Sequence, residues 1–371
     1  MSEGRINVGI IGCGQISGTY MKNIKTIFPK YLNMVACTDI IMDRARARGA
    51  EFGVEAREPD AFYASKDIQI AVSLTNAPAH GAVCRRALES GMHAYTEKPV
   101  CIELGEARRL LELSGERGLL FGCAPETFMG AGLQTAKKLL DDGWIGEPVA
   151  AVASMRRLIL DSVPEWVYQY GAGPLLDMGP YYVTALVSLL GPVAGVKAYA
   201  GSPYARRVVT DGEGATRLMP TEVDTYIGGI ARFASGVLAS ITTTFDVWAR
   251  PGYQLEVNGR EGSLLLPDPN TFEGPVKIYG RRSPEPAEVP LTHGFNYETR
   301  GIGVADMAYS LLHGRRHTAN GHMGTHVLEV MSALIESSKS GAEVEIQSRF
   351  EPAPPLPYNY EAVLRGECVP E

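Results

Sequence analysis

The chain has 371 residues, 45% of them hydrophobic, and a formal net charge of −7 at pH 7. This length exceeds what one hydrophobic core usually supports, so we expect two domains. No block of basic residues is present, which argues against a nucleic acid or an anionic membrane as partner and leaves a small molecule as the expected one.

Cysteine usage and the start of the chain indicate a compartment. The six cysteines are scattered, without a C-x-x-C spacing, which favours reduced thiols and a cytoplasmic protein. No basic and apolar leader precedes the first β-rich run. No apolar run approaches the roughly 20 residues that a membrane span needs, so we expect no membrane contact.

Short β-rich runs alternate with helical patterns over the first third of the chain. Alternation of this kind is typical of βαβ units, so we predict an α/β domain with a doubly wound parallel sheet over residues 1–124. The predicted strands are 7–11, 34–38, 70–75, 93–96 and 119–124.

A glycine turn follows the first predicted strand. Gly12, Gly14 and Ser17 form G-x-G-x-x-S between a strand and a helix, where a dinucleotide-binding loop places the helix N-terminus against the phosphates. Ser17 replaces the third glycine, which loosens the contact between helix and strand. Asp39 follows at about the 20-residue offset of the acid that binds the adenosine ribose and repels a 2′-phosphate, so we expect NAD. The alternative is a turn that binds nothing. The predicted cofactor contacts here are Gly12, Gly14, Gln15, Ile16 and Asp39.

Two further loops leave the carboxyl ends of predicted parallel strands, "LTNAPAH" and "AYTEKPV". Ligands of doubly wound sheets bind beyond these ends, so both loops should border the ribose and the nicotinamide. His80 has an alternative role as a helix cap, and Glu-Lys-Pro elsewhere would be a solvated turn. The predicted contacts are Thr75, Asn76, Pro78, His80, Glu97 and Lys98.

From about residue 147 the pattern changes to longer β-rich segments joined by short Gly or Ser turns. We predict a mainly antiparallel, open sheet with helices on one face, in an α+β domain over 125–350. A proline-rich tail at 351–371 should pack back on the body, and the uncovered sheet face should be a dimer interface. The predicted strands are 148–158, 222–233, 236–245, 253–258 and 262–266, and the helices are 131–142, 180–190, 302–313 and 324–339.

Residues 171–191, "GAGPLLDMGPYYVTALVSLLG", place an acid and two phenols around a predicted helix start. Pro180 suits the first turn of a helix. The apolar spacing from Tyr182 onwards gives the helix one buried face, which leaves Asp177 and Tyr181 free to point elsewhere. We expect these two side chains in an active site.

Other side chains suit the binding of a sugar. Aromatic faces pack on sugar C–H groups, and an arginine can bind a carboxylate or sulfonate, although an arginine on a strand is more often an exposed ion-pair partner. In "HGRRHTANGHMGTH" no carboxylate separates the spaced histidines, so we predict no metal, and His317 or His326 near the substrate. The predicted substrate contacts are Glu126, Gln134, Arg156, Arg157, Trp166, Tyr168, Tyr182 and His317.

Taken together, several motifs resemble those of the Gfo/Idh/MocA oxidoreductases over nearly the whole chain. They are the glycine turn with Asp39, "TNAPAH", "EKP", "GWIGEP" (143–148), "GAGPLLDMGP" and "RGIGVADMA" (300–308). The resemblance implies an N-terminal Rossmann domain, a nicotinamide bound between two domains, and homodimers or homotetramers. It also implies that Lys98 contacts the substrate hydroxyl, with Asp177 beside it. Many members have a histidine as proton acceptor where this chain has Tyr181.

A tyrosine is a poor base at neutral pH, because its ordinary pKa is about 10. A neighbouring ammonium and a helix N-terminus both favour the phenolate. We therefore hypothesise that Tyr181 takes the hydroxyl proton as hydride leaves for NAD, with Lys98 lowering the pKa of Tyr181 and Asp177 orienting Lys98. Alternatively, Tyr181 only shapes the pocket, and Lys98 or a water moves the proton.

Three functions are compatible with these residues. The first is an NAD-dependent oxidoreductase acting on a secondary hydroxyl of a sugar, cyclitol or glycoside. The second is an NAD-dependent glycoside hydrolase that works by oxidation, elimination, hydration and reduction, as sulfoquinovose glycosidases of this fold do. The third is a nucleotide-sensing protein without turnover, which the presence of both Lys98 and Asp177 disfavours.

Overall fold

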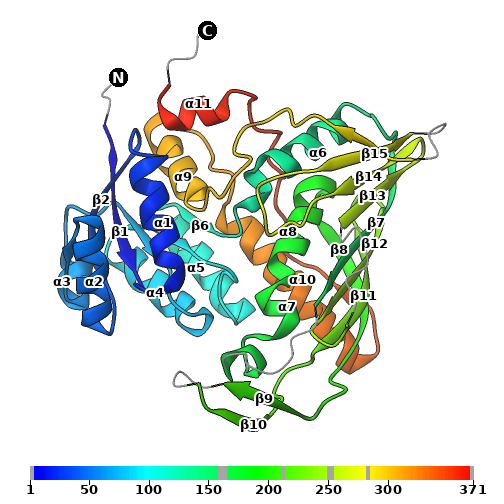
Figure 1. Ribbon diagram of the computed structural model, residues 1–371, viewed down its shortest axis with the longest axis horizontal. Coiled ribbons are helices and arrows are strands. Elements are labelled where there is room, and N and C mark those ends of the chain that lie inside the picture. Colours follow the sequence, from blue (N-terminus) through cyan, green and yellow to red (C-terminus); the bar gives the residue numbers. More distant parts are fainter. Residues whose placement is uncertain (1–3, 158–164, 211–213, 249–254, 281–284, 368–371) are drawn as a thin grey trace. The chain divides into compact units, whose positions relative to one another are not determined.

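The computed structural model describes residues 4–157, 165–210, 214–248, 255–280 and 285–367. It forms two compact units, both built from separate stretches of chain (Figure 1). The first unit consists of Met1–Gly130, His293–Thr325 and Leu356–Glu371, and the second of Ala131–Thr292 and His326–Pro355. Residue 158 and residues 253–254, which we included in predicted strands, and Cys368 lie outside the described residues.

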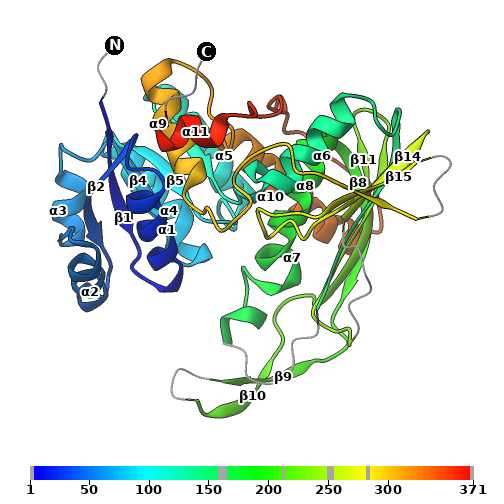
Figure 2. The same cartoon turned by 45° about the horizontal axis from the view of Figure 1, so that its top comes forward.

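The first unit contains a six-stranded sheet in which every pair of neighbours is parallel (Figures 1 and 2). The order β3-β2-β1-β4-β5-β6 is that of a Rossmann sheet, with its switch point between β1 and β4. The predicted doubly wound fold is confirmed. The strands are β1 (Ile6–Ile11), β2 (Leu32–Thr38), β3 (Glu55–Ala56), β4 (Ile70–Ser73), β5 (His93–Thr96) and β6 (Phe121–Cys123). The helices are α1 (Gln15–Thr26), α2 (Met42–Phe52), α3 (Pro59–Ala64), α4 (Ala77–Glu89) and α5 (Leu104–Glu116).

The stretch His293–Thr325 packs on this Rossmann sheet, although we expected it in the domain 125–350. It contains α9 (Ile302–His313), and the segment after α9 pairs with β6. Asn320 forms a β-bridge with Gly122, and the Cys123 N–H donates to the Ala319 carbonyl at 3.1 Å. These main-chain bonds extend the edge of the parallel sheet, which is the physical reason for the different boundary.

The end of the chain also belongs to the first unit. The short helix α11 (Tyr360–Arg365) follows the proline-rich segment. The Tyr360 hydroxyl donates to the buried carboxylate of Asp306 in α9, which also pairs with Arg315. Leu364 is fully buried. The tail is thus held by both a polar and an apolar anchor.

The second unit contains a nine-stranded sheet in the order β16-β15-β14-β13-β7-β12-β11-β8-β17. All neighbours are antiparallel except β7 and β12, which confirms the predicted mainly antiparallel sheet. The prediction missed β8, β15 to β17 and a separate hairpin of β9 and β10. The bounds are β7 (Pro148–Arg156), β8 (Val193–Gly201), β9 (Arg206–Thr210), β10 (Thr216–Pro220), β11 (Tyr226–Phe233), β12 (Leu238–Thr244), β13 (Leu255–Gly259), β14 (Gly262–Leu266), β15 (Val276–Gly280), β16 (Ala287–Val289) and β17 (Val344–Glu345).

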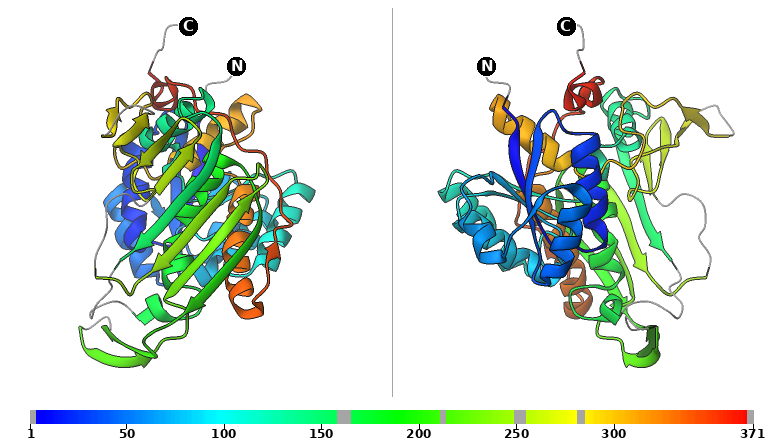
Figure 3. Two further views of the ribbon diagram at one scale, coloured as in Figure 1. Left: turned by 90° about the vertical axis from the view of Figure 1, so that its right-hand side faces the viewer. Right: turned by 60° about the vertical axis from the view of Figure 1, so that its left-hand side comes forward.

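Helices cover one face of the nine-stranded sheet. On β11, Ile227 and Ala231 are buried, whereas Ile230 on the opposite face is 46% exposed. The left view of Figure 3 looks onto this uncovered face. The helices of this unit are α6 (Ala131–Asp141), α7 (Gly173–Asp177), α8 (Gly179–Leu190) and most of α10 (Gly321–Ser340). None of the helices in the described part of the chain is long and apolar enough to cross a membrane.

Candidate active site

The glycine turn after β1 has the geometry of a dinucleotide-binding loop. Gly12 has a φ of 93°, and a Cβ there would lie 2.8 Å from the main chain of Leu74 and Thr75, so no side chain fits. Gly14 caps α1 without a side-chain hydrogen bond, and nothing lies within 4 Å of the place of its Cβ. The N–H groups at the start of α1 therefore have no side-chain cap at Gly14, and helix N-termini of this kind can bind a pyrophosphate. Gln15 and Ile16 form the first turn of this helix.

The residues behind the turn hold it in shape. The Ser17 hydroxyl, which replaces the third glycine, is buried and donates to the Gly14 carbonyl at 2.6 Å. Arg48 of α2 donates to the same carbonyl at 3.3 Å and packs against Gly18. Sequence reasoning missed Arg48, because an arginine on a highly charged helix has the pattern of a solvent-exposed residue.

Asp39 lies beyond the end of β2 and is only 8% exposed. Its Oδ2 accepts the Cys13 N–H at 2.7 Å, and its Oδ1 accepts the Ile41 N–H at 2.8 Å. The carboxylate is therefore fixed beside the glycine turn. Each oxygen keeps a second lone pair, which is what binding a ribose diol requires.

His80 joins the two loops that follow β4 and β5. Its buried ring lies with one nitrogen 2.7 Å from the Pro99 carbonyl oxygen and the other 3.1 Å from that of Thr75. Burial lowers the pKa of His80, and the hydrogen bonds to the two carbonyls act in the opposite direction. Asn76, at the N-terminus of α4, and Pro78 are exposed. His80 thus contacts neighbouring main chain, and its contact with the cofactor stays a prediction.

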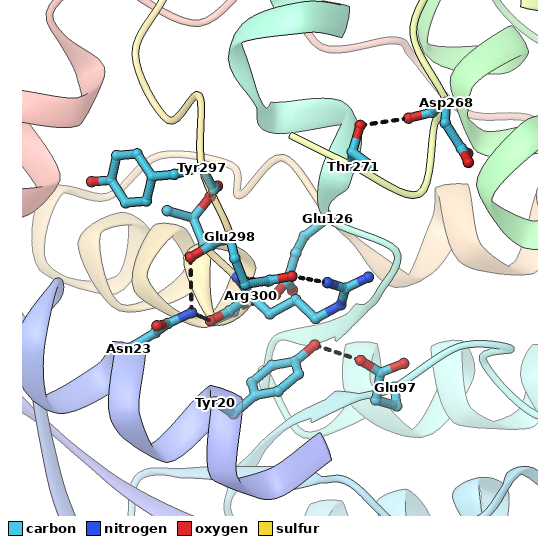
Figure 4. A network of polar contacts seen from close by, with 11 residues as sticks. Tyr20, Asn23, Glu97, Glu126, Asp268, Thr271, Tyr297, Glu298 and Arg300 are labelled. Atoms are coloured by element: carbon cyan, nitrogen blue, oxygen red, sulfur yellow. Dashed lines mark hydrogen bonds and ion pairs between the residues drawn. The ribbon is translucent and has the colours of Figure 1, made fainter. Parts of the chain in front are cut away.

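Glu97 and Lys98 follow β5 at the carboxyl edge of the sheet. The Tyr20 hydroxyl donates to Glu97 Oε1 at 2.8 Å (Figure 4). The Lys98 N–H donates to Glu97 Oε2 at 3.0 Å. Glu97 is 8% exposed, and Lys98 is half-buried. The buried carboxylate thus sets the main-chain position from which the Lys98 ammonium extends.

Glu126 is a buried carboxyl in the same unit, 1% exposed. It accepts hydrogen bonds from the Tyr95 hydroxyl and the Gly301 N–H, and a Cβ at Gly303 would collide with that hydroxyl. Burial raises the pKa of Glu126 to about 7, outweighing the two donors that lower it. We expected Glu126 to bind substrate. The two hydrogen bonds connect Glu126 with β5 and with the residue before α9, and its contact with a substrate stays a prediction.

Two predicted histidines lie among main-chain partners. His317 is buried with Nε2 3.1 Å from the carbonyl oxygen of Phe121, the first residue of β6, and burial lowers the pKa of His317 to about 4. This is the amino-terminal side of the strand, away from the carboxyl edge. His326 is buried in the second unit, where it accepts the Val193 N–H at 3.0 Å. Among the described residues, no group of three metal-ligating side chains occurs.

The second unit carries the predicted acid and phenols. Asp177 ends α7 and is half-buried, and Tyr181 lies in the first turn of α8 and is 7% exposed. Pro180 occupies the start of α8 as predicted, and no side chain caps this helix. Tyr182 is fully buried.

The remaining predicted substrate contacts differ in their exposure. Trp166 in the short helix Glu165–Tyr168 is 51% exposed, whereas Tyr168 is 1% exposed. The guanidinium carbon of Arg207 lies over the Tyr168 ring, 5.4 Å from the centroid of that ring. Arg156 ends β7 half-buried and Arg157 is exposed. Gln134 in α6 is buried.

The structure thus groups the predicted site residues by unit. One group lies at the carboxyl edge of the parallel sheet in the first unit: Gly12, Gly14, Asp39, Thr75, Asn76, Glu97 and Lys98. A second group lies in the second unit: Gln134, Arg156, Arg157, Trp166, Tyr168, Asp177, Tyr181 and Tyr182. Sequence reasoning did not find Tyr20, Asn23 and Tyr95, which had the signal of ordinary core positions.

Comparisons with known proteins agree with this architecture. Residues 6–124 match the model of an oxidoreductase family with an NAD-binding Rossmann fold, and residues 133–265 match that of the GFO/IDH/MocA C-terminal domain. The 1,5-anhydro-D-fructose reductase of Ensifer adhaerens is 23% identical over 83% of this chain and 90% of its own. Inositol 2-dehydrogenase 3 of Saccharopolyspora erythraea is 26% identical over 71% of this chain and 74% of its own. The solved structure of levoglucosan dehydrogenase with NADH and levoglucosan shares the fold, with a TM-score of 0.81, 19% identity, and coverage of 93% of this chain and 100% of that one.

Proposed function

Because the chain belongs to the Gfo/Idh/MocA family of oxidoreductases, with an NAD-binding Rossmann fold at its N-terminus, we propose that it transfers a hydride between NAD and a secondary hydroxyl of a sugar, cyclitol or glycoside. The observation that carries this proposal is the common sheet edge of the glycine turn, Asp39 and Lys98. That edge combines anion-binding N–H groups, a ribose-binding acid and an ammonium. The substrate class is supported by relatives named for an anhydrosugar, inositol and levoglucosan.

Groups of the first unit suit the pyrophosphate and the two riboses of the cofactor. The uncapped N–H groups of α1 bind the pyrophosphate, and Asp39 accepts the ribose hydroxyls and repels a 2′-phosphate. Thr75 and Asn76 border the nicotinamide ribose. When bound, NAD supplies the hydride acceptor.

At the substrate, the Lys98 ammonium donates a hydrogen bond to the reacting hydroxyl and Asp177 orients that ammonium. Tyr181 takes the hydroxyl proton, and the uncapped start of α8 favours its phenolate. In the competing assignment Tyr181 only shapes the pocket, and Lys98 or a water moves the proton.

Tyr181→Phe separates these assignments. Loss of a general base should lower kcat by about 10² to 10⁴ while the affinity for NADH, measured by fluorescence titration, stays within about twofold. Tyr358→Phe, at an exposed position in the C-terminal segment, is the matched control. A Tyr181→Phe enzyme that keeps hydride transfer within a few-fold of the parent assigns the proton to another group.

The test of the overall function uses a panel of polyols, sugars and p-nitrophenyl glycosides with NAD. Net formation of NADH identifies an oxidoreductase. Release of p-nitrophenol with catalytic NAD and no net NADH identifies the redox-neutral glycoside hydrolase instead. Binding of NAD without any turnover across the panel contradicts both.

We also propose that the protein is a cytoplasmic homodimer formed through the uncovered sheet face, and that two such dimers can form a tetramer. Tyr199 is 77% exposed and Ile230 is 46% exposed on that face, an arrangement that a second copy of the chain would bury. The cysteines in the described ranges are all free thiols, which fits a reducing compartment.

A further inference from the structure

The polar network of Figure 4 includes a phenol that the proposed reaction does not use. Tyr20 lies on α1, the helix whose N-terminus follows the glycine turn, and its side chain is fully buried. Its hydroxyl donates to one oxygen of Glu97 at 2.8 Å, and the other oxygen accepts the Lys98 N–H at 3.0 Å. One carboxylate therefore joins the helix at the pyrophosphate site to the peptide of the reacting lysine.

We propose that Tyr20 is a positioning residue for Lys98: by holding the Glu97 carboxylate in one orientation, it fixes the peptide from which the Lys98 side chain extends. The proposal rests on the proposed function for the role of Lys98 in the reaction. The positional link from Tyr20 to the Lys98 peptide stands on the geometry of the first unit alone.

Three observations support a positioning role. A carboxylate that is only 8% exposed is costly to leave without donors, so losing the phenol frees Glu97 to turn towards another partner. Burial raises the pKa of Tyr20, which keeps the phenol protonated and donating at neutral pH. On the same helix, Asn23 donates to the carbonyls of Glu298 at 3.3 Å and Arg300 at 2.9 Å, so α1 itself is held (Figure 4).

The same unit supplies a matched control. Tyr95 is also a fully buried phenol that donates to a buried carboxylate, that of Glu126. The other oxygen of Glu126 accepts the Gly301 N–H instead of the Lys98 N–H. Tyr95→Phe therefore removes a hydrogen bond of the same kind and leaves the link from Glu97 to Lys98 intact.

Hydrogen–deuterium exchange at the Lys98 amide, resolved by fragmentation mass spectrometry on the protein without added ligand, tests the positional link. Tyr20→Phe should speed this exchange about tenfold or more, because the amide loses a fixed charged acceptor. Tyr95→Phe should leave it within about twofold while lowering the Tm comparably. No change in Tyr20→Phe, or equal changes in both variants, would overturn the proposal. Tyr20→His keeps a ring N–H donor and should fall between wild type and Tyr20→Phe, which provides a second variant if Tyr20→Phe does not fold.

Steady-state kinetics on a substrate from the panel tests the consequence for the reaction. Tyr20→Phe should lower kcat about tenfold or more while KM for NAD stays within about twofold, since only the Lys98 peptide moves. The double variant Tyr20→Phe/Glu97→Gln should be no slower than Glu97→Gln, because the two side chains act as one unit. Equal losses of kcat in Tyr20→Phe and Tyr95→Phe would reduce the network to a structural role. If the wild type oxidises nothing in the panel, the proposed function fails, and the exchange experiment still decides the positional link.

Discussion

Replacing Glu126 by glutamine should change how the stability of the protein depends on pH. The carboxyl is 1% exposed, and burial raises its pKa from 4.5 to about 7 in the folded protein. Glutamine has the same shape, keeps an oxygen for the Gly301 N–H, and has no charge to bury. The variant therefore reports the cost of ionising this one group inside the first unit.

The size and sign of the effect follow from the two pKa values. Below pH 4.5 the carboxyl is protonated in both states, so wild type and Glu126→Gln should have similar stability. Between pH 4.5 and about 7 the folded protein binds more protons than the unfolded chain, so wild-type stability falls as the pH rises. At about 1.4 kcal/mol per pKa unit, the loss relative to the variant reaches roughly 3 kcal/mol and persists above pH 7.

Thermal unfolding followed from pH 4.5 to 8.5 in steps of about half a unit measures this difference. For a unit of this size, roughly 3 kcal/mol corresponds to about 6–12 °C, so Glu126→Gln should gain that much in Tm over wild type as the pH rises. Glu89→Gln, at an exposed position in the same unit, controls for the loss of one charge. A Tm difference between wild type and Glu126→Gln that stays flat across the range refutes the reasoning.

Three other perturbations have defined outcomes. Asp39→Asn should reduce the preference for NADH over NADPH about tenfold or more in fluorescence titrations, because the charge that repels a 2′-phosphate is gone; an unchanged preference would contradict this role. Gly12→Ala should lower the Tm by several degrees and abolish NADH binding, because the added Cβ would collide with main-chain atoms. Gly14→Ala should leave the Tm unchanged and weaken only NADH binding, because the added Cβ would enter open space. Ile230→Glu should convert the proposed homodimer to a monomer in sedimentation velocity without loss of the folded state; a dimer that persists would place the interface elsewhere.

The Rossmann sheet and the placement of the glycine turn and Asp39 at its carboxyl edge were predictable from local pattern. The strand at 7–11 is followed at once by Gly12 and Gly14, and the next strand by Asp39, so an ordered spacing indicates the topology and the candidate site. The start of α8 at Pro180 was predictable for the same reason, because a proline in the first turn is a local signal.

The long-range arrangement was not predictable. Tyr20 and Glu97 are 77 positions apart, and a tyrosine on the buried face of a helix has the same local signal whether it packs or donates. The strand β8 was not predicted because its sequence, "VAGVKAYAG", contains few β-branched residues and is interrupted by glycine. The hydrogen bonds of Glu126 were not predictable either, because a sequence shows a carboxyl after a strand but not that Tyr95 and Gly301 donate to it.

The assembly of the first unit from three stretches sets an order of events during synthesis. A ribosome makes the glycine turn and Asp39 first, but α9 and the segment that extends the edge of β6 emerge only after almost all of the second unit. Tyr360, which meets Asp306, comes later still. A nascent chain stopped after residue 130 would leave β6 without these neighbours. The unit whose synthesis begins first is therefore the unit that is completed last.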